Sequence, residues 1–416
     1  MNDVFRQPSA DVNTFTAMKL FPLLIGCLSV VLMVGCASPP KTVRNAGPWN
    51  LAELKQTPAT KWGARTGLVQ EVYYAGEPYR GRPTRVFAYL ARPDGEGAFP
   101  AMLLVHGGGG KAFRAWAEHW ARRGYVALAM DTAGCGPDGP LADGGPDQND
   151  AGKFREFTDA EVRDMWTYHA VAAVIRGCSL LATVPGVDAN RIGITGISWG
   201  GYLTCIVAGL DDRVKVAVSV YGCGFLGENS VWKNGSLAKM SPDSRARWLR
   251  EFDPSQYLGG VNCPFLFLNG SNDFGYPLDS FRASSRLVSP PFRRISVVIN
   301  LPHGHIWTFG EVDAFVDGVL LDGIPLPELE PMQVEDGWVR SRVKSALPLK
   351  SAMLNYTSDT GEWQQRRWTS VPAEIAGHLI KARLPEPRPL VWFLSVTDER
   401  GLRASTEYEE LAADSP

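Results

Sequence analysis

A serine between two glycines is the first residue in this chain whose surroundings suggest chemistry. Ser198 lies in the segment Thr-Gly-Ile-Ser-Trp-Gly-Gly-Tyr, which contains the pattern Gly-x-Ser-x-Gly. An apolar strand-like run precedes the segment and an apolar helical stretch follows it. This is the setting of a nucleophile elbow, a strained turn that exposes a serine hydroxyl between a strand and a helix. We therefore expect Ser198 to be a nucleophile.

A run of four glycines, residues 107–110, follows His106 and the apolar stretch that ends at Val105. Glycines let backbone N–H groups come close to a developing oxyanion. We expect Gly108 and Trp199, the residue after the serine, to supply the two amides of an oxyanion hole. A phosphate-binding loop is the alternative, but no Lys-Ser/Thr pair follows the glycines and no GxGxxG is formed. His106 itself is expected to be a hydrogen-bonded structural residue.

An acid stands where a catalytic carboxylate is needed. Asp273 lies just past the apolar run 265–268, which reads as a buried strand. Three other acids are possible alternatives, but none directly follows such a strand: Asp253, Asp279 and Asp313.

The general base is chosen by elimination, because the chain has only six histidines. His119 and His169 fall in expected helices before the nucleophile, and His378 lies in the C-terminal region. The base must sit on a loop beyond the last strand of the core, where it can reach both serine and acid. His303 and His305 both meet that requirement, and the residues alone leave the choice open.

No metal or cofactor is expected. The His-x-His pair lacks a third ligand at a fitting spacing, and the five cysteines after the leader form no CxxC. Those cysteines permit one or two disulfides whose pairing the sequence does not give. Lys plus Arg number 42 and Asp plus Glu 44, so no basic surplus favours a nucleic-acid partner.

Two compositional zones follow the leader. From about residue 65 to 330, short apolar runs alternate with longer amphipathic stretches, which indicates βαβ units and a mostly parallel sheet with helices on both faces. Strands are expected at 85–90, 101–105, 125–130, 191–195, 214–220, 264–268 and 295–299, and a helix at 164–181. From 335 to 416 short strand-like runs follow one another at 352–357, 363–368, 378–384 and 390–396. They predict a small sandwich of immunoglobulin or fibronectin type III kind.

The N-terminus is expected to be a targeting segment. Residues 20–35 carry no charge and follow Lys19, as in a signal-peptide core. The run ends at Gly35-Cys36, which resembles a bacterial lipobox, so residues 1–35 are expected to be a lipoprotein signal, with Met18 as a possible start. Cys36 would be lipidated, and 36–62 would be a tether before a catalytic domain at 63–330. A plain secretory signal is the alternative. The localisation expected is the bacterial cell envelope, and the lipid anchor would be the only membrane contact.

The order Ser198, Asp273, His303 or His305 resembles that of the α/β-hydrolases. More narrowly, residues 80–330 are similar to the dienelactone hydrolase, acetylxylan esterase and prolyl oligopeptidase-type branch. The segments that carry the resemblance are 106–108, 131–136, 187–193, 196–202 and 269–273. In that branch the catalytic His usually follows Gly, which implies His305 rather than His303. Bacterial members described as acetylxylan-esterase-like share an appended C-terminal β domain.

We therefore expect an exported serine hydrolase that deacetylates a small-molecule or polysaccharide ester through an acyl-enzyme. Trp232 and Trp307 fall near expected site loops and could stack on sugar rings. A serine peptidase and a dienelactone-type lactone hydrolase are the alternatives within the same chemistry. The roughly 45 residues before the core cannot build the β-propeller that such peptidases usually carry, which favours an esterase. A non-catalytic carbohydrate-binding lipoprotein is a more distant alternative.

Overall fold

The computed structural model describes residues 46–306, 309–386 and 388–412. These described residues form one compact unit. The expected signal peptide, Cys36 and Trp307 lie outside the described residues.

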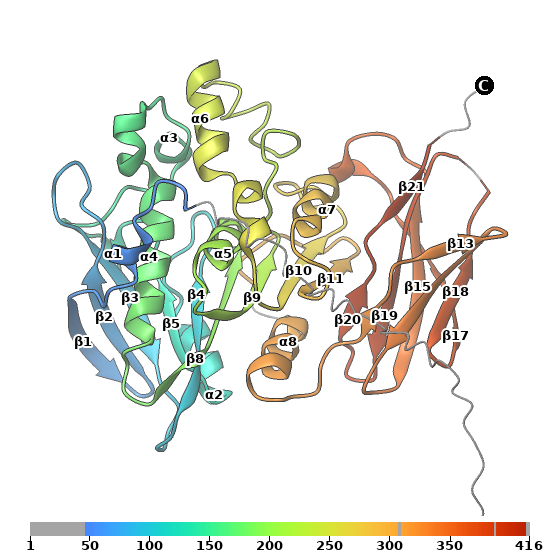
Figure 1. Cartoon of the computed structure of the whole chain (residues 1–416), viewed down its shortest axis with the longest axis horizontal. Coiled ribbons are helices and arrows are strands. Elements are labelled where there is room, and N and C mark those ends of the chain that lie inside the picture. The colour runs from blue at the N-terminus through green and yellow to red at the C-terminus, as the bar shows by residue number, and fades with distance from the viewer. Residues whose placement is uncertain (1–45, 307–308, 387, 413–416) are drawn as a thin grey trace, which may run out of the picture. The chain divides into compact units, whose positions relative to one another are not determined.

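A nine-stranded sheet runs through the first part of the unit, in the order β1-β2-β3-β5-β4-β8-β9-β10-β11 (Figure 1). Strands β1 to β3 are antiparallel, and β3 joins β5 antiparallel. The other six strands of the sheet are parallel to one another: β5, β4, β8, β9, β10 and β11. The bounds are β1 Thr60–Thr66, β2 Val69–Ala75, β3 Arg85–Ala91, β4 Phe99–Val105, β5 Val126–Met130, β8 Val187–Ile197, β9 Val214–Val220, β10 Phe265–Gly270 and β11 Arg293–Val298.

Helices cover both faces of this sheet. Leu103 on β4 lies 3.2 Å from where a Cβ on Gly177 of α4 would stand. Its neighbour Met102 points to the other face, because side chains alternate along a strand. On that face a Cβ on Gly193 would meet both Met102 and Leu320 of α8. The expected mostly parallel sheet with helices on both faces is therefore confirmed. The helices are α1 Leu51–Leu54, α2 Arg114–Arg122, α3 Asp150–Lys153, α4 Trp166–Leu181, α5 Trp199–Leu210, α6 Pro242–Phe252, α7 Leu278–Arg286 and α8 Gly310–Leu320, and 3₁₀ turns span Asp159–Asp164, Pro254–Gln256, Leu258–Gly260 and Trp363–Gln365.

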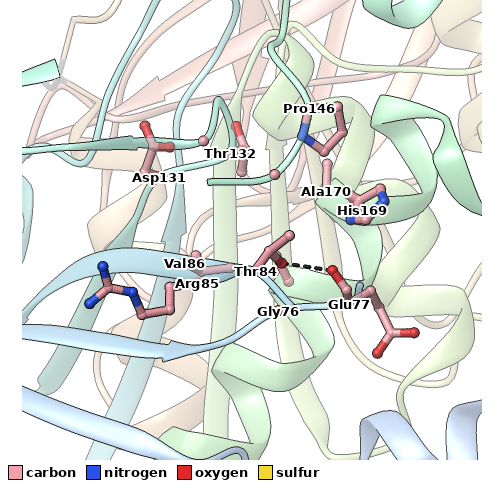
Figure 2. Close-up of a pocket in the computed structure, with 13 residues that line it drawn as sticks. Gly76, Glu77, Thr84, Arg85, Val86, Asp131, Thr132, Pro146, His169 and Ala170 are labelled. Atoms are coloured by element: carbon pink, nitrogen blue, oxygen red, sulfur yellow. Dashed lines mark hydrogen bonds between the residues drawn. The ribbon is translucent and has the colours of Figure 1, made fainter. Parts of the chain in front are cut away.

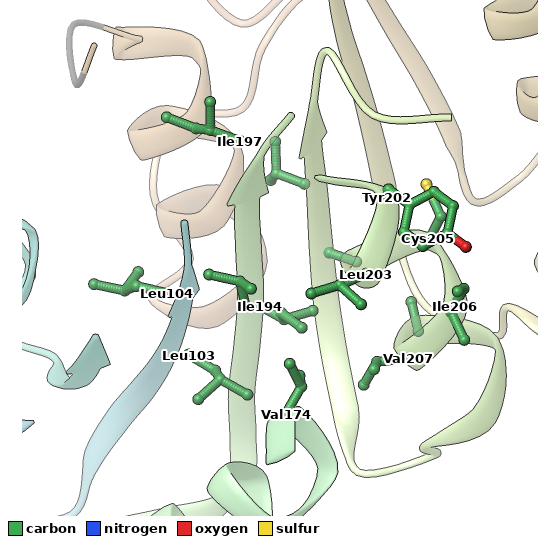
Figure 3. Packing of buried hydrophobic residues seen from close by; sticks show 14 of the residues in the cluster. Leu103, Leu104, Val174, Ile194, Ile197, Tyr202, Leu203, Cys205, Ile206 and Val207 are labelled. Carbon is green, nitrogen blue, oxygen red and sulfur yellow. The ribbon is translucent and has the colours of Figure 1, made fainter. Parts of the chain in front are cut away.

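Strand β4 and helix α5 are buried along nearly their whole length. Strand β4 is buried from Pro100 to Val105, and all twelve residues of α5 are buried. Figure 3 shows Leu103, Ile194 and Leu203 packed together with their neighbours from β4, β8, α4 and α5. Such continuous apolar runs are typical of strands covered on both faces. This packing makes a rigid base for the loops at the strand ends.

Part of the expected tether is folded. Trp49 is buried, and its indole N–H donates to the carbonyl of Tyr168 at 2.9 Å. Helix α1 follows, and β1 begins at Thr60 as an edge strand of the main sheet. The tether assignment of 36–62 is thus wrong for residues 49–62, because Trp49 anchors this segment on α4.

The C-terminal region consists of two five-stranded sheets, as expected for a sandwich. One has the order β12-β14-β18-β17 with β13 beside β14, and the other β16-β15-β19-β20 with β21 beside β19. Apolar side chains from both sheets share one core cluster. The bounds are β12 Glu328–Leu329, β13 Gln333–Glu335, β14 Trp338–Lys344, β15 Leu349–Thr357, β16 Thr369–Pro372, β17 Glu374–Ala376, β18 Leu379–Arg383, β19 Leu390–Asp398, β20 Arg403–Ser405 and β21 Glu409–Leu411.

One expected strand is absent from this region. Residues 363–368 form a 3₁₀ turn and an irregular stretch, with Trp363 buried.

Among the described residues, no helix is long and apolar enough to cross a membrane. Free thiols occur at Cys135, Cys178, Cys205 and Cys223.

Candidate active site

Three candidate residues, together with Tyr221, follow four neighbouring parallel strands. Ser198 comes directly after β8, Tyr221 after β9, Asp273 three residues after β10, and His303 five residues after β11. The strand ends lie level, since Ile197 pairs with Val220. The carboxyl edge of an open parallel sheet is where α/β proteins place their sites, so this edge gathers the predicted chemistry.

Ser198 occupies a strained turn. Its φ is 58° and its ψ −119°, a combination that non-glycine residues rarely adopt. The turn is held because the Ser198 amide donates to Val220 O at 2.8 Å and its carbonyl accepts from Tyr202 N at 2.8 Å. Gly200 lets the first turn of α5 lie close to the end of β4, since a Cβ there would stand 2.0 Å from the carbonyl oxygen of Val105. This is the predicted nucleophile elbow.

The glycine loop lies against the serine. A Cβ on Gly107 would stand 2.8 Å from Ile197 O and 2.9 Å from the Cβ of Ser198, so only glycine fits. A Cβ on Gly108 would lie 3.0 Å from Cδ1 of Trp199. Trp199 is the first residue of α5, and the first amides of a helix lack an intrahelical acceptor. The amides of Gly108 and Trp199 are therefore on neighbouring segments beside Ser198.

Asp273 holds one imidazole in a fixed orientation. Its Oδ1 accepts from the amides of Gly275 and Tyr276 at 2.9 and 2.7 Å. Its Oδ2 lies 2.6 Å from Nδ1 of His303. The carboxylate side chain is fully buried and the imidazole is 13% exposed. With Nδ1 carrying the proton of this hydrogen bond, Nε2 of His303 is left as the basic nitrogen.

His305, which the family resemblance favoured, is used differently. Its Nε2 accepts from the amide of Gly107 at 3.1 Å, and its ring lies against those of Phe113 and Trp116. Burial lowers the pKa of His305, and the nearby His106 acts in the same direction, so the ring is neutral at neutral pH. The preference for His305 is thus corrected to His303, because the lone pair of His305 supports the glycine loop and Asp273 pairs with its neighbour.

Two aromatic residues around His303 were not foreseen. Tyr221 stacks on the imidazole with ring centroids 4.5 Å apart, and its hydroxyl donates to Pro302 O at 3.0 Å. Burial raises the pKa of this hydroxyl, so it remains a donor. Phe274 contacts the same imidazole at 4.7 Å and is 56% exposed. Both follow buried strands directly or by a few residues, and that position is the signal that could have found them.

Trp232 lies in an aromatic cluster beside the site. Its ring centroid is 4.6 Å from that of Trp199 and 5.2 Å from that of Tyr276. Trp232 is half-buried, whereas Trp199 is buried. The ammonium group of Lys153 lies 4.6 Å from the Trp199 ring centroid, and the lysine is buried. Helix α3 is therefore anchored at the site through its last residue, Lys153.

The other candidate acids and His106 have structural partners. Asp253 accepts from the amides of Phe225 and Leu226, and Asp313 pairs with His119. His106 is buried, and its Nε2 accepts from the amide of Thr132 at 2.9 Å, as expected of a structural histidine.

A small cavity lies apart from these residues. It measures about 30 Å³ and has Asp131, Thr132 and His169 among its lining residues. Figure 2 shows the hydroxyl of Thr84 on its wall, donating to the carbonyl oxygen of Glu77 at 2.7 Å. The cavity holds little more than one water molecule and does not include Ser198, Asp273 or His303. Across the described ranges, no group of three His, Cys, Asp or Glu side chains is arranged to hold a metal ion.

The carboxyl edge of the sheet thus carries a strained serine with two amides beside it, and an imidazole oriented by a carboxylate. Such a set supports nucleophilic attack by the hydroxyl, proton transfer through the imidazole and stabilisation of an oxyanion.

Comparisons with known proteins match part of the chain, and the family match includes the glycine loop and Ser198 but ends before Asp273 and His303. Residues 53–257 match the acetyl xylan esterase family (AXE1). Over 250 residues the chain is 23% identical to acetyl esterase Axe7A of Xylanibacter ruminicola, covering 55% of this chain and 54% of that protein. It is 26% identical over 231 residues to the uncharacterized peptidase YuxL of Bacillus subtilis, covering 51% and 31% of the two chains. The chain thus spans about half or less of these relatives.

A solved structure shows the same fold. The acetyl xylan esterase from Paenibacillus sp. R4 superimposes with a TM-score of 0.53 at 21% identity. The match covers 65% of this chain and 92% of that one.

Proposed function

We propose that this chain, which has the α/β-hydrolase fold and matches the acetyl xylan esterase family over residues 53–257, is a serine carboxylesterase that removes acetyl groups from carbohydrate esters. Ser198 is the nucleophile, His303 the general base and Asp273 the acid that orients it. The observation that carries the proposal is Ser198 at φ 58° on the turn between β8 and α5, beside the glycine loop.

In the first half of the reaction, Nε2 of His303 takes the proton of the Ser198 hydroxyl as its oxygen attacks the ester carbonyl. The amides of Gly108 and Trp199 donate to the oxyanion of the tetrahedral intermediate. His303 then gives its proton to the departing alcohol, which leaves an acetyl group on Ser198. A water molecule repeats these steps on the acyl-enzyme and releases acetate.

The aromatic side chains around the base favour a sugar as the alcohol part of the substrate. The departing alcohol must lie next to His303, because that imidazole protonates it. Phe274 presents an exposed ring at this place, and half-buried Trp232 lies near Gly275 of the same loop. Aromatic faces are suited to the apolar face of a sugar ring. The match to the acetyl xylan esterase family supports an acetyl group as the acyl part of the ester.

The test compares three substrate types on the purified chain. We expect turnover of p-nitrophenyl acetate and release of acetate from acetylated xylan, and no turnover of aminoacyl p-nitroanilides. Ser198→Ala should lower kcat by about 10⁴-fold or more, and a fluorophosphonate probe should label Ser198. Cleavage of the anilides in preference to both esters would favour a peptidase, and labelling of another serine would overturn the assignment.

We also propose that the protein is an exported lipoprotein anchored through Cys36. The uncharged run 20–35 and the Gly35-Cys36 pair support this. Two or three acyl chains bind a membrane stably, whereas one binds it only marginally. The mature protein should therefore stay with membranes through a high-salt wash. Cys36→Ser should remain unlipidated, and an unmodified mature N-terminus at another residue would contradict the anchor.

A further inference from the structure

The C-terminal sheets touch the loop that carries the catalytic acid. Asn272 immediately precedes Asp273, and its side-chain amide donates to the carbonyl oxygen of Arg366 at 2.7 Å and to that of Gln364 at 3.2 Å. Both carbonyls belong to the turn around Trp363–Gln365, between β15 and β16. One side chain thus joins the acid's loop to the C-terminal region.

The same side chain is linked to the loop of the base. The oxygen of the Asn272 side chain accepts from the hydroxyl of Ser271. That hydroxyl in turn accepts from the amide of Asn300 at 3.0 Å. Asn300 is three residues before His303, so a chain of hydrogen bonds runs from the C-terminal turn through Asn272 to the loop of His303.

A second contact lies on the strand that leads to His303. β11 is the last strand of the main sheet, and its amide of Val297 donates to the hydroxyl of Ser405 on β20 at 2.8 Å. The hydroxyl of Ser296 donates to Arg403 O at 3.1 Å. An uncovered edge strand has free backbone groups and is prone to slip or pair wrongly. β20 covers part of this edge just before the catalytic loop.

These contacts rest on a shared hydrophobic core. Strand β19 is buried on both faces: Trp392 and Leu394 pack inside the C-terminal sandwich, while Val391 and Phe393 belong to the core of the main sheet. Trp363 and Tyr408 join that main core as well. The turn that accepts from Asn272 is therefore fixed by packing and does not hang on a flexible linker.

We propose that Asn272 is a positioning residue for Asp273, through which the C-terminal sheets fix the geometry of the Asp273–His303 pair. This inference rests on the proposed function. A shift of about 1 Å in a catalytic group can cost on the order of 100-fold in rate. In Asn272→Ala the loop loses its two anchors on the C-terminal turn, and with them one of the restraints that hold the carboxylate against Nδ1 of His303.

The experiment measures both activity and the Asp–His hydrogen bond. In the full chain, a proton held in the short bond between Asp273 and His303 should give a far-downfield ¹H NMR resonance, identified by its absence in His303→Gln. In Asn272→Ala we expect kcat and kcat/KM for p-nitrophenyl acetate to fall together, by about 10- to 100-fold. The downfield resonance should move or broaden. Asn272→Ser, whose hydroxyl cannot span both carbonyls, should behave in the same way if the alanine variant folds poorly.

The matched control weakens the same pair of regions at another place. Arg286 of α7 pairs with Glu407 near β21 at 2.7 Å and is about half exposed. Its surroundings are an open groove of about 740 Å³, away from residues 271–273. Arg286→Ala should leave kcat and the resonance unchanged. An equal loss in this control, or Asn272 variants with an unchanged resonance, would overturn the inference. A resonance that depends on Asn272 in a chain without esterase activity would uphold the inference and refute the proposed function.

Discussion

Tyr221 stacks its ring on the imidazole of His303, and its hydroxyl donates to the carbonyl of the preceding residue, Pro302. The side chain thus holds both the ring and the backbone of the base. Its own backbone adopts a φ of 61°, which turns it toward the loop after β11. With Asp273 on Nδ1, these contacts leave Nε2 of His303 as the nitrogen able to take a proton.

The two neighbouring histidines should differ strongly on mutation. His303→Ala removes the base, so kcat for p-nitrophenyl acetate should fall by about 10⁴-fold or more, as for Ser198→Ala. His305→Ala removes an acceptor for the amide of Gly107 and loosens the glycine loop, which should cost about tenfold. Steady-state kinetics of the two variants, with folding checked by circular dichroism, decide between them. An inactive His305→Ala variant together with an active His303→Ala variant would make His305 the general base.

The sequence predicted the serine, the acid and the glycine loop because each follows a buried strand directly or within a few residues. Parallel strands end at one edge of the sheet, so an apolar run marks where chemistry is placed. The choice between His303 and His305 depends on the path of the loop. Pro302, Tyr221 and Asp273 fix that path, and these contacts between distant segments leave no periodic pattern in the sequence.

The same limit explains the errors at the two ends of the fold. Trp49 precedes only a short helix, and its burial arises from contacts with Tyr168, more than 100 residues away. Trp363 and Trp368 read as a strand because aromatic residues favour strands. In the structure, the ring of Trp363 lies tilted against that of Tyr408 and Trp368 meets Phe393 edge to face, so packing overrides the local preference.

Stability should fall in mild acid because of His169. Burial lowers the pKa of His169 to about 4, against about 6.5 in an unfolded chain. Between these values the unfolded state binds a proton that the folded state does not, so the free energy of unfolding falls as pH decreases from about 6.5 to about 4, by up to about 3 kcal/mol. Urea unfolding at pH 7 and pH 4.5 should show a smaller drop in His169→Gln. The exposed His378 provides the control, and His378→Gln should keep the wild-type drop.

Phe274 should set the preference for sugar esters. Its exposed ring contacts the imidazole that protonates the leaving alcohol, so a sugar in that position would lie against it. Phe274→Ala should lower kcat/KM for an acetylated xylo-oligosaccharide by roughly tenfold, mainly through KM, which corresponds to the loss of one aromatic contact. Ethyl acetate has no ring to stack, so its kcat/KM should stay within about twofold of wild type. Phe274→Tyr keeps the ring and should retain the sugar preference. Equal losses on both esters would mean that Phe274 supports His303 itself, and no loss on either would place the sugar on another side of the site.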